Sequence, residues 1–200
     1  MIVKICGVTR ADDAARIVAA GADWIGLNFW PRSKRFVDPV RARAIVAAAR
    51  TARPGVVLVG VFVDQDLGHI TAVADDLGLD RIQLHGDESP AVCAALGARA
   101  FKALPVGSRA DLATAAAYPG DVVLLDAPTP GRGGSGVAFD WEIAMKAESV
   151  TGKRVLLAGG LHPGNVAAAI LTGRPWGVDV ASGVEHAPGI KDLDQVAGFV

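Results

Sequence analysis

The residues best suited to chemistry in this sequence follow short apolar runs. Two loops near the end of the chain are rich in glycine, one with Gly159 and Gly160 and one with Ser182 and Gly183. Glycine lets a backbone approach a ligand closely, and N–H groups at the start of a following helix attract anions. One such loop alone is usually just a turn. Two in succession favour a phosphate site formed by these four residues.

A thiol and a carboxyl group are the second candidate pair. Cys6 ends the first apolar run of the chain, and Asp126 ends a run well past its middle. If both runs are parallel strands of one sheet, their carboxyl ends meet at the same rim. The two side chains would then serve as the acid and base of a proton transfer that needs neither a metal nor a cofactor.

Other polar residues also stand at or near the ends of apolar runs, and each has an ordinary structural alternative as a turn residue, a cap or a satisfied buried group. They are Asn28, Asp64, Gln83, His85 and Asp179. Lys4 lies two residues before Cys6, so strand alternation puts both on one face. Lys4 is expected to pair with a carboxylate such as Asp179, to tune the pKa of Cys6, or to do both.

The elements that must position these residues alternate along the whole chain, with β-rich runs followed by helical runs. The expected strands are Ile2–Cys6, Trp24–Asn28, Val56–Val63, Arg81–His85, Ala100–Leu104, Val122–Asp126, Arg154–Ala158 and Gly177–Val180. Eight βα units in 200 residues predict an α/β fold, a single-domain (β/α)8 TIM barrel spanning residues 1–200. The long connections 29–37 and 127–139 follow strands 2 and 6 and are candidates for gripping a substrate.

Capping residues set the expected helix boundaries. Starts are expected at Thr9, at Asp38 with Pro39, at Ser89 with Pro90 and at Asp140, and stops at Gly21, Gly78, Gly97 and Gly173.

Composition narrows the classes of function. A net charge of −1 without a basic tract argues against nucleic acid or an anionic membrane as partner. No apolar run approaches about 18 residues and the chain opens on a strand, so a cytoplasmic protein is expected. Cys6 and Cys93 provide no disulfide framework, and the four histidines show no metal-binding spacing. We expect neither metal nor cofactor, and either a monomer or a homodimer.

Ten short segments carry a family resemblance. In chain order they span residues 4–9, 21–29, 31–37, 60–63, 83–88, 125–126, 133–136, 139–141, 158–161 and 180–185. Together they resemble the phosphoribosylanthranilate isomerase family of tryptophan biosynthesis, from the first strand to the last helix. Departures occur at His162, Gly164 and Ile190, and they affect only a helix cap and a loop edge.

The resemblance implies an Amadori rearrangement of a phosphorylated aminoaldose, a small-molecule substrate. It makes Asp126 the acid that protonates the ring oxygen and Cys6 the base that removes the C2 proton. An ordinary thiol has a pKa of about 8.5, so Cys6 would need a nearby positive charge, from Lys4 or the opened Schiff base. The resemblance also assigns the anthranilate carboxylate to Arg35, which chemistry alone does not separate from Arg32.

The glycine-rich loop 131–136 after strand 6 is expected to move over the site, because flexible lids exclude water during such chemistry. Three alternatives stay open: the histidine-pathway aminoaldose isomerase, a barrel that only senses a phosphosugar, and a structural domain fused to a pathway enzyme. The first of these uses aspartates at strands 1 and 5, where this chain has Cys6 and Leu104-Pro105.

Overall fold

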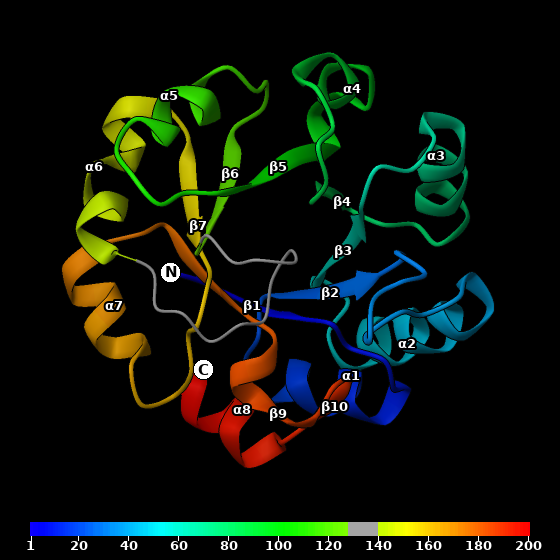
Figure 1. The fold of residues 1–200 in the computed structure, drawn as a ribbon. Helices are drawn as coiled ribbons and strands as arrows, with labels where there is room; N and C mark the ends of the chain where they lie inside the picture. Colours follow the sequence, from blue (N-terminus) through cyan, green and yellow to red (C-terminus); the bar gives the residue numbers. More distant parts are fainter. Residues whose placement is uncertain (128–139) are drawn as a thin grey trace.

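The strands of the computed structural model, which describes residues 1–127 and 140–200, close into one parallel barrel (Figure 1). Each strand pairs with its neighbours in chain order, and the last pairs with the first. The strands are β1 (Ile2–Cys6), β2 (Trp24–Asn28), β3 (Val57–Phe62), β4 (Arg81–Leu84), β5 (Ala100–Pro105), β6 (Val122–Asp126), β7 (Arg154–Leu157) and β8 (Gly177–Val180). The predicted (β/α)8 TIM barrel is confirmed.

Helices surround the barrel on its outside (Figure 1). They are α1 (Ala11–Ala19), α2 (Pro39–Ala52), α3 (Leu67–Asp76), α4 (Pro90–Ala95), α5 (Asp111–Ala116), α6 (Trp141–Thr151), α7 (Val166–Gly173) and α8 (Leu193–Phe199), with short 3-10 helices η1 (Gly97–Arg99) and η2 (Ser182–Val184). Two short antiparallel strands that the sequence did not suggest, β9 (Glu185–Ala187) and β10 (Ile190–Lys191), lie between η2 and α8.

Strand alternation divides the core into two clusters. One contains alternate strand residues such as Trp24, Val59, Phe101 and Leu124, which pack with one another. The other contains the residues between them, such as Leu58 and Leu125, together with apolar residues of the helices. Both faces of the strands are therefore buried, which explains why the strands are nearly continuous apolar runs in the sequence.

The expected helix boundaries are partly correct. The side chain of Asp38 accepts a hydrogen bond from the N–H of Arg41, with Pro39 in the first turn, and Asp140 caps α6 in the same way. Thr9 does not cap α1, because Arg10 takes the N-cap position and the Thr9 hydroxyl donates to the carbonyl of Gly189.

Ser89 occupies the N-cap position of α4, but its side chain makes no capping hydrogen bond. Gly21, Gly78 and Gly97 have the positive φ expected after a helix. Gly173 is wrong as a stop, since it is the last residue of α7 and the left-handed conformation (φ 46°) falls on Arg174.

None of the helices in the described ranges is long and apolar enough to cross a membrane. Across 1–127 and 140–200 there is also no cluster of three or more histidine, cysteine or acidic side chains able to hold a metal ion.

Candidate active site

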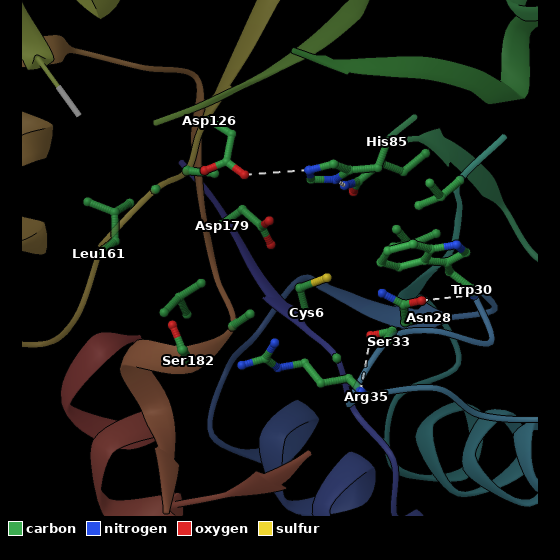
Figure 2. A pocket seen from close by; sticks show the side chains of 18 of the residues that line it. Cys6, Asn28, Trp30, Ser33, Arg35, His85, Asp126, Leu161, Asp179 and Ser182 are labelled. Atoms are coloured by element: carbon green, nitrogen blue, oxygen red, sulfur yellow. Dashed lines mark hydrogen bonds and ion pairs between the residues drawn. The ribbon is translucent and has the colours of Figure 1, made fainter. Parts of the chain in front are cut away.

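A pocket opens at the carboxyl ends of the barrel strands and gathers most of the predicted residues (Figure 2). Its lining includes Cys6, Asn28, Arg35, Gln83, His85, Asp126, Gly159, Gly160, Asp179 and Ser182. Trp30, Ser33 and Leu161 also line it. Lys4, Asp64 and Gly183 do not line it.

Lys4 forms a buried ion pair next to the thiol of Cys6. Its ammonium nitrogen lies 2.9 Å from Oδ1 of Asp179 and is completely buried. The two residues also face each other in the β1–β8 pairing, so the ion pair closes the barrel. The pair expected from strand alternation is present, and it leaves a positive charge beside Cys6.

This charge affects the titration of the thiol. Burial raises the pKa of Cys6, while the positive charge of Lys4 acts in the opposite direction and Asp179 adds to the rise. Burial alone would lower the pKa of Lys4, but attraction to Asp179 and to Cys6 outweighs it and raises that pKa. Lys4 therefore stays an ammonium group, and its charge favours the thiolate that a base at Cys6 requires.

Gly26 of β2 provides the space for this arrangement. A Cβ atom at Gly26 would lie 2.9 Å from the sulfur of Cys6 and 3.3 Å from the nitrogen of Lys4. Both distances are shorter than ordinary van der Waals contact, so any side chain here would separate the thiol from the ammonium group. Sequence reasoning missed Gly26, because nothing local distinguishes it from a strand glycine.

Asp126 lies across the pocket in a chain of polar groups (Figure 2). Its Oδ2 is 3.5 Å from Nε2 of His85, and Nδ1 of His85 is 2.8 Å from the amide nitrogen of Gln83. An amide nitrogen only donates, so Nδ1 accepts and the ring proton belongs on Nε2, facing Asp126. The buried Oε1 of Gln83 has no hydrogen-bond partner among the residues described.

Arg35 reaches the pocket from the loop after β2. Its side chain passes over Gly7, where an added Cβ would overlap Cδ of Arg35. The Nε and Nη2 atoms donate to the two carboxylate oxygens of Glu185 at 2.8 and 2.6 Å. No hydrogen bond from Nη1 to another described residue is present, so this side of the guanidinium is available for a ligand. Arg32 stacks near Trp30 at 5.6 Å and does not line the pocket.

The two glycine loops meet on the remaining side of the pocket. Gly159 and Gly160 have φ values of 89° and 67°, in the region that favours glycine. A Cβ on Gly183 would overlap the carbonyl oxygen of Leu161, so Gly183 allows the loops to pack together instead of lining the pocket. Within the described residues, no backbone carbonyl accepts from the N–H of Gly160 or of Ser182. These donors suit an anion.

Sequence reasoning missed the buried Lys191 and its partner Glu185, whose side chain is 4% exposed. In the sequence, Glu185 stands out only as the last residue of the segment 180–185. Lys191 only follows Ile190, where the chain departs from the family pattern. The loop 131–136, expected to close over the site, lies outside the described residues.

Comparisons with known proteins agree on one family. A family model described as "N-(5'phosphoribosyl)anthranilate (PRA) isomerase" matches residues 3–200. The N-(5'-phosphoribosyl)anthranilate isomerase of Myxococcus xanthus is 48% identical over 202 residues, which cover 99% of this chain and 93% of that protein. This chain belongs to the phosphoribosylanthranilate isomerase family.

Solved structures of the family have the same fold. One phosphoribosylanthranilate isomerase, in complex with reduced 1-(o-carboxyphenylamino)-1-deoxyribulose 5-phosphate, has a TM-score of 0.86 and 37% identity, covering 100% of this chain and 96% of that one. A structure of monomers generated from the dimeric Thermotoga maritima isomerase has a TM-score of 0.84 and 37% identity, with the same coverage. The family therefore includes a dimeric member and a structure with a phosphorylated ligand.

A charged side chain at Gly160 tests whether this loop binds the phosphate. Gly160→Asp should raise the KM for a phosphorylated substrate about tenfold or more, because the new carboxylate repels the phosphate. Gly160→Asn is the matched control, since asparagine and aspartate are similar in size and both tolerate positive φ. Steady-state kinetics and thermal unfolding are measured for both variants. Equal KM values for the two variants would contradict a phosphate site at this loop.

Proposed function

We propose that this chain is a phosphoribosylanthranilate isomerase of tryptophan biosynthesis, with Cys6 and Asp126 as its base and acid. Family membership over residues 3–200 supports the reaction. The observation that carries the assignment of roles is the presence of this thiol and this carboxyl group in one pocket with a glycine-lined anion site. The substrate is N-(5'-phosphoribosyl)anthranilate, and no metal or cofactor takes part in the steps below.

Asp126 acts in the first step. Its carboxyl proton passes to the furanose ring oxygen as the bond from C1 to that oxygen breaks, and the lone pair of the anthranilate nitrogen forms a C1=N double bond. His85 lies beside Asp126 and donates its Nε2 proton toward the carboxylate that this step leaves behind. Gln83 fixes the His85 ring through Nδ1. We assign His85 and Gln83 as positioning residues for the acid.

Cys6 acts in the second step. The protonated C1=N group draws electrons from C2, so the thiolate removes the C2 proton and an enolamine forms. The enolamine gains a proton at C1 and loses the C2 hydroxyl proton, which gives the ketone product. Lys4 stays protonated throughout and supports the thiolate, while Asp179 keeps Lys4 in place.

Two charged ends of the substrate are bound by different parts of the pocket. Gly160 and Ser182 offer the phosphate N–H groups that have no backbone acceptor in the described part of the chain, with Gly159 and Gly183 shaping the loops. Arg35 offers its outer guanidinium edge to the anthranilate carboxylate, with which a planar fork makes two parallel hydrogen bonds. Fixing both ends orients C1 and C2 between Asp126 and Cys6.

We also propose a cellular location and an oligomeric state for the chain. A cytoplasmic enzyme is consistent with a step of amino-acid biosynthesis, and both a monomer and a homodimer remain compatible with the family. Sedimentation equilibrium over a range of protein concentrations distinguishes the two states.

The function is tested by following freshly prepared phosphoribosylanthranilate by fluorescence. The purified chain should consume it at a rate proportional to enzyme concentration, and mass spectrometry should find the carboxyphenylamino-deoxyribulose phosphate product. The histidine-pathway aminoaldose is the control substrate, and we expect little or no turnover of it. Turnover of that substrate alone, or of neither compound, would refute the proposal.

A further inference from the structure

A buried lysine near the end of the chain contacts three parts of the candidate site. The ammonium group of Lys191 donates to the carbonyl of Cys6 at 2.6 Å, to the carbonyl of Ala181 at 2.9 Å and to Oε1 of Glu185 at 3.0 Å. Three acceptors require three N–H donors, so the amine is protonated. The side chain is 0% exposed. A buried charge with this many partners is costly to place and does not arise from simple packing.

Glu185 extends the contact to Arg35. Its Oε1 accepts from Lys191, from the N–H of Gly189 at 3.2 Å and from Nε of Arg35, and its Oε2 accepts from Nη2 of Arg35. The Glu185 side chain is only 4% exposed, whereas that of Arg35 is 20% exposed. The buried carboxylate therefore holds the inner edge of the guanidinium and leaves its outer edge facing the pocket.

The electrostatics fit a fixed ionic network. Burial would raise the pKa of Glu185, but its hydrogen bonds with Arg35 and the attraction of Lys191 outweigh burial and lower it. The hydrogen bonds to Glu185 raise the pKa of Arg35. Burial lowers the pKa of Lys191 against the attraction of Glu185. The three acceptors around its amine require the protonated form, so one negative group lies between two positive ones.

Three segments distant in sequence meet at this network. Cys6 ends β1 and carries the proposed base, Ala181 directly precedes Ser182 in the phosphate loop, and Arg35 belongs to the loop after β2. Hydrogen bonds from one ammonium group to the carbonyls of Cys6 and Ala181 fix the separation of the two strand ends. The carboxylate then fixes Arg35 relative to both.

We propose that Glu185 and Lys191 are positioning residues that hold the thiol of Cys6, the Ser182 loop and the guanidinium of Arg35 in one arrangement. The inference rests on the proposed function, since it assigns these parts to the base, the phosphate and the carboxylate. Neither residue lines the pocket. Each acts through the backbone or side chain that it holds.

Calorimetry measures the binding of reduced 1-(o-carboxyphenylamino)-1-deoxyribulose 5-phosphate. It tests the positioning role of Glu185 and Lys191 without requiring turnover. Glu185→Gln should raise the Kd and the KM about tenfold or more, because the amide holds Arg35 more weakly, and should change kcat less. Lys191→Met should raise the KM and also lower kcat, because it releases the strand end that carries Cys6. Unchanged Kd, KM and kcat in folded variants would overturn the proposal.

The exposed ion pair of Arg43 with Asp76 provides the matched control. It joins α2 to α3 away from the pocket, with side chains 56% and 45% exposed. Asp76→Asn makes the same change of carboxylate to amide as Glu185→Gln, and it should leave Kd and KM unchanged. Thermal unfolding of every variant separates loss of fold from loss of position.

A double-mutant cycle makes the result specific to Arg35. If Glu185 acts through Arg35, Glu185→Gln should weaken binding much less in an Arg35→Ala background than in the parent chain. Equal effects in both backgrounds would show that Glu185 does not position Arg35. The cycle decides even if Lys191→Met fails to fold.

Alkylation of Cys6 by iodoacetamide gives a readout that is independent of the proposed function. Among residues 1–127 and 140–200, the charged groups that act on the thiol are Lys4, Asp179, Arg35 and Lys191. Because Lys191 acts to lower the pKa of Cys6, Lys191→Met should move the alkylation midpoint to higher pH. Peptide mapping separates Cys6 from the buried Cys93. A parent chain without isomerase activity would refute the proposed function. An unmoved alkylation midpoint would count only against the positioning role of Lys191.

Discussion

Replacing Cys6 with alanine should lower kcat about 10²- to 10⁴-fold, and Asp126→Asn should lower it by a similar factor, while binding of the reduced product changes little. Each substitution removes one proton transfer and leaves the phosphate loops and Arg35 in place. Stopped assays at saturating substrate and calorimetry measure the two quantities separately. Cys93→Ala is the matched control, because Cys93 is the other free thiol and lies outside the pocket.

The direction in which the rate changes with pH tests whether Cys6 is the base. A base at Cys6 must be a thiolate, and burial raises the pKa of this thiol. The value of kcat/KM should therefore rise with pH through the neutral range, and this rise should be absent from the residual activity of Cys6→Ala. Substrate deuterated at C2 should react more slowly with the parent chain. If Cys6→Ser matches the parent in rate and in isotope effect, the thiol is not the base.

Arg35→Ala should weaken binding of the substrate and of the reduced product by about 2–5 kcal/mol, because it removes a half-buried guanidinium group from the anthranilate carboxylate. Glu185 keeps Lys191 and the N–H of Gly189 as partners, so the fold should survive the change. Calorimetry gives the loss in affinity, and thermal unfolding checks the fold.

Arg32→Ala is the control for this prediction. It shares the loop and the charge, but its side chain lies over Trp30 outside the pocket lining. It should cost well under 1 kcal/mol of binding. Equal losses from the two variants would mean that Arg35 has no specific role. A compound without the carboxylate should bind the parent chain and Arg35→Ala alike.

Much of the barrel could be predicted from the sequence because parallel strands are buried on both faces. Apolar runs such as Val122–Asp126 therefore stand out, and strand ends were placed within about one residue of those observed. Period-two alternation also placed Lys4 and Cys6 on one face, where a buried lysine needs a carboxylate partner, and Asp179 is that partner. The sequence was sufficient to predict those features that depend on the residues of a single strand.

The remaining features depend on contacts between distant residues. Thr9 carries the sequence signal of a helix cap, yet its hydroxyl bonds Gly189, 180 residues away. Arg35 reads as one of three basic residues in a loop until Glu185 approaches it from 150 residues further on. Gly26 and Gly7 matter only because of side chains that pass over them. No window of the sequence contains both partners of these contacts.

The pairing of Lys4 with Asp179 has a consequence for how the molecule assembles during synthesis. Asp179 is made 175 residues after Lys4, and it is the acidic partner of a completely buried ammonium group. A nascent chain that ends before β8 would have to bury that charge unpaired or leave the first strand in water. Closing β1 against β8 with the charge of Lys4 paired therefore has to wait until β8 has been made. Lys4 acquires its carboxylate partner, and Cys6 its complete surroundings, only in a chain that includes β8.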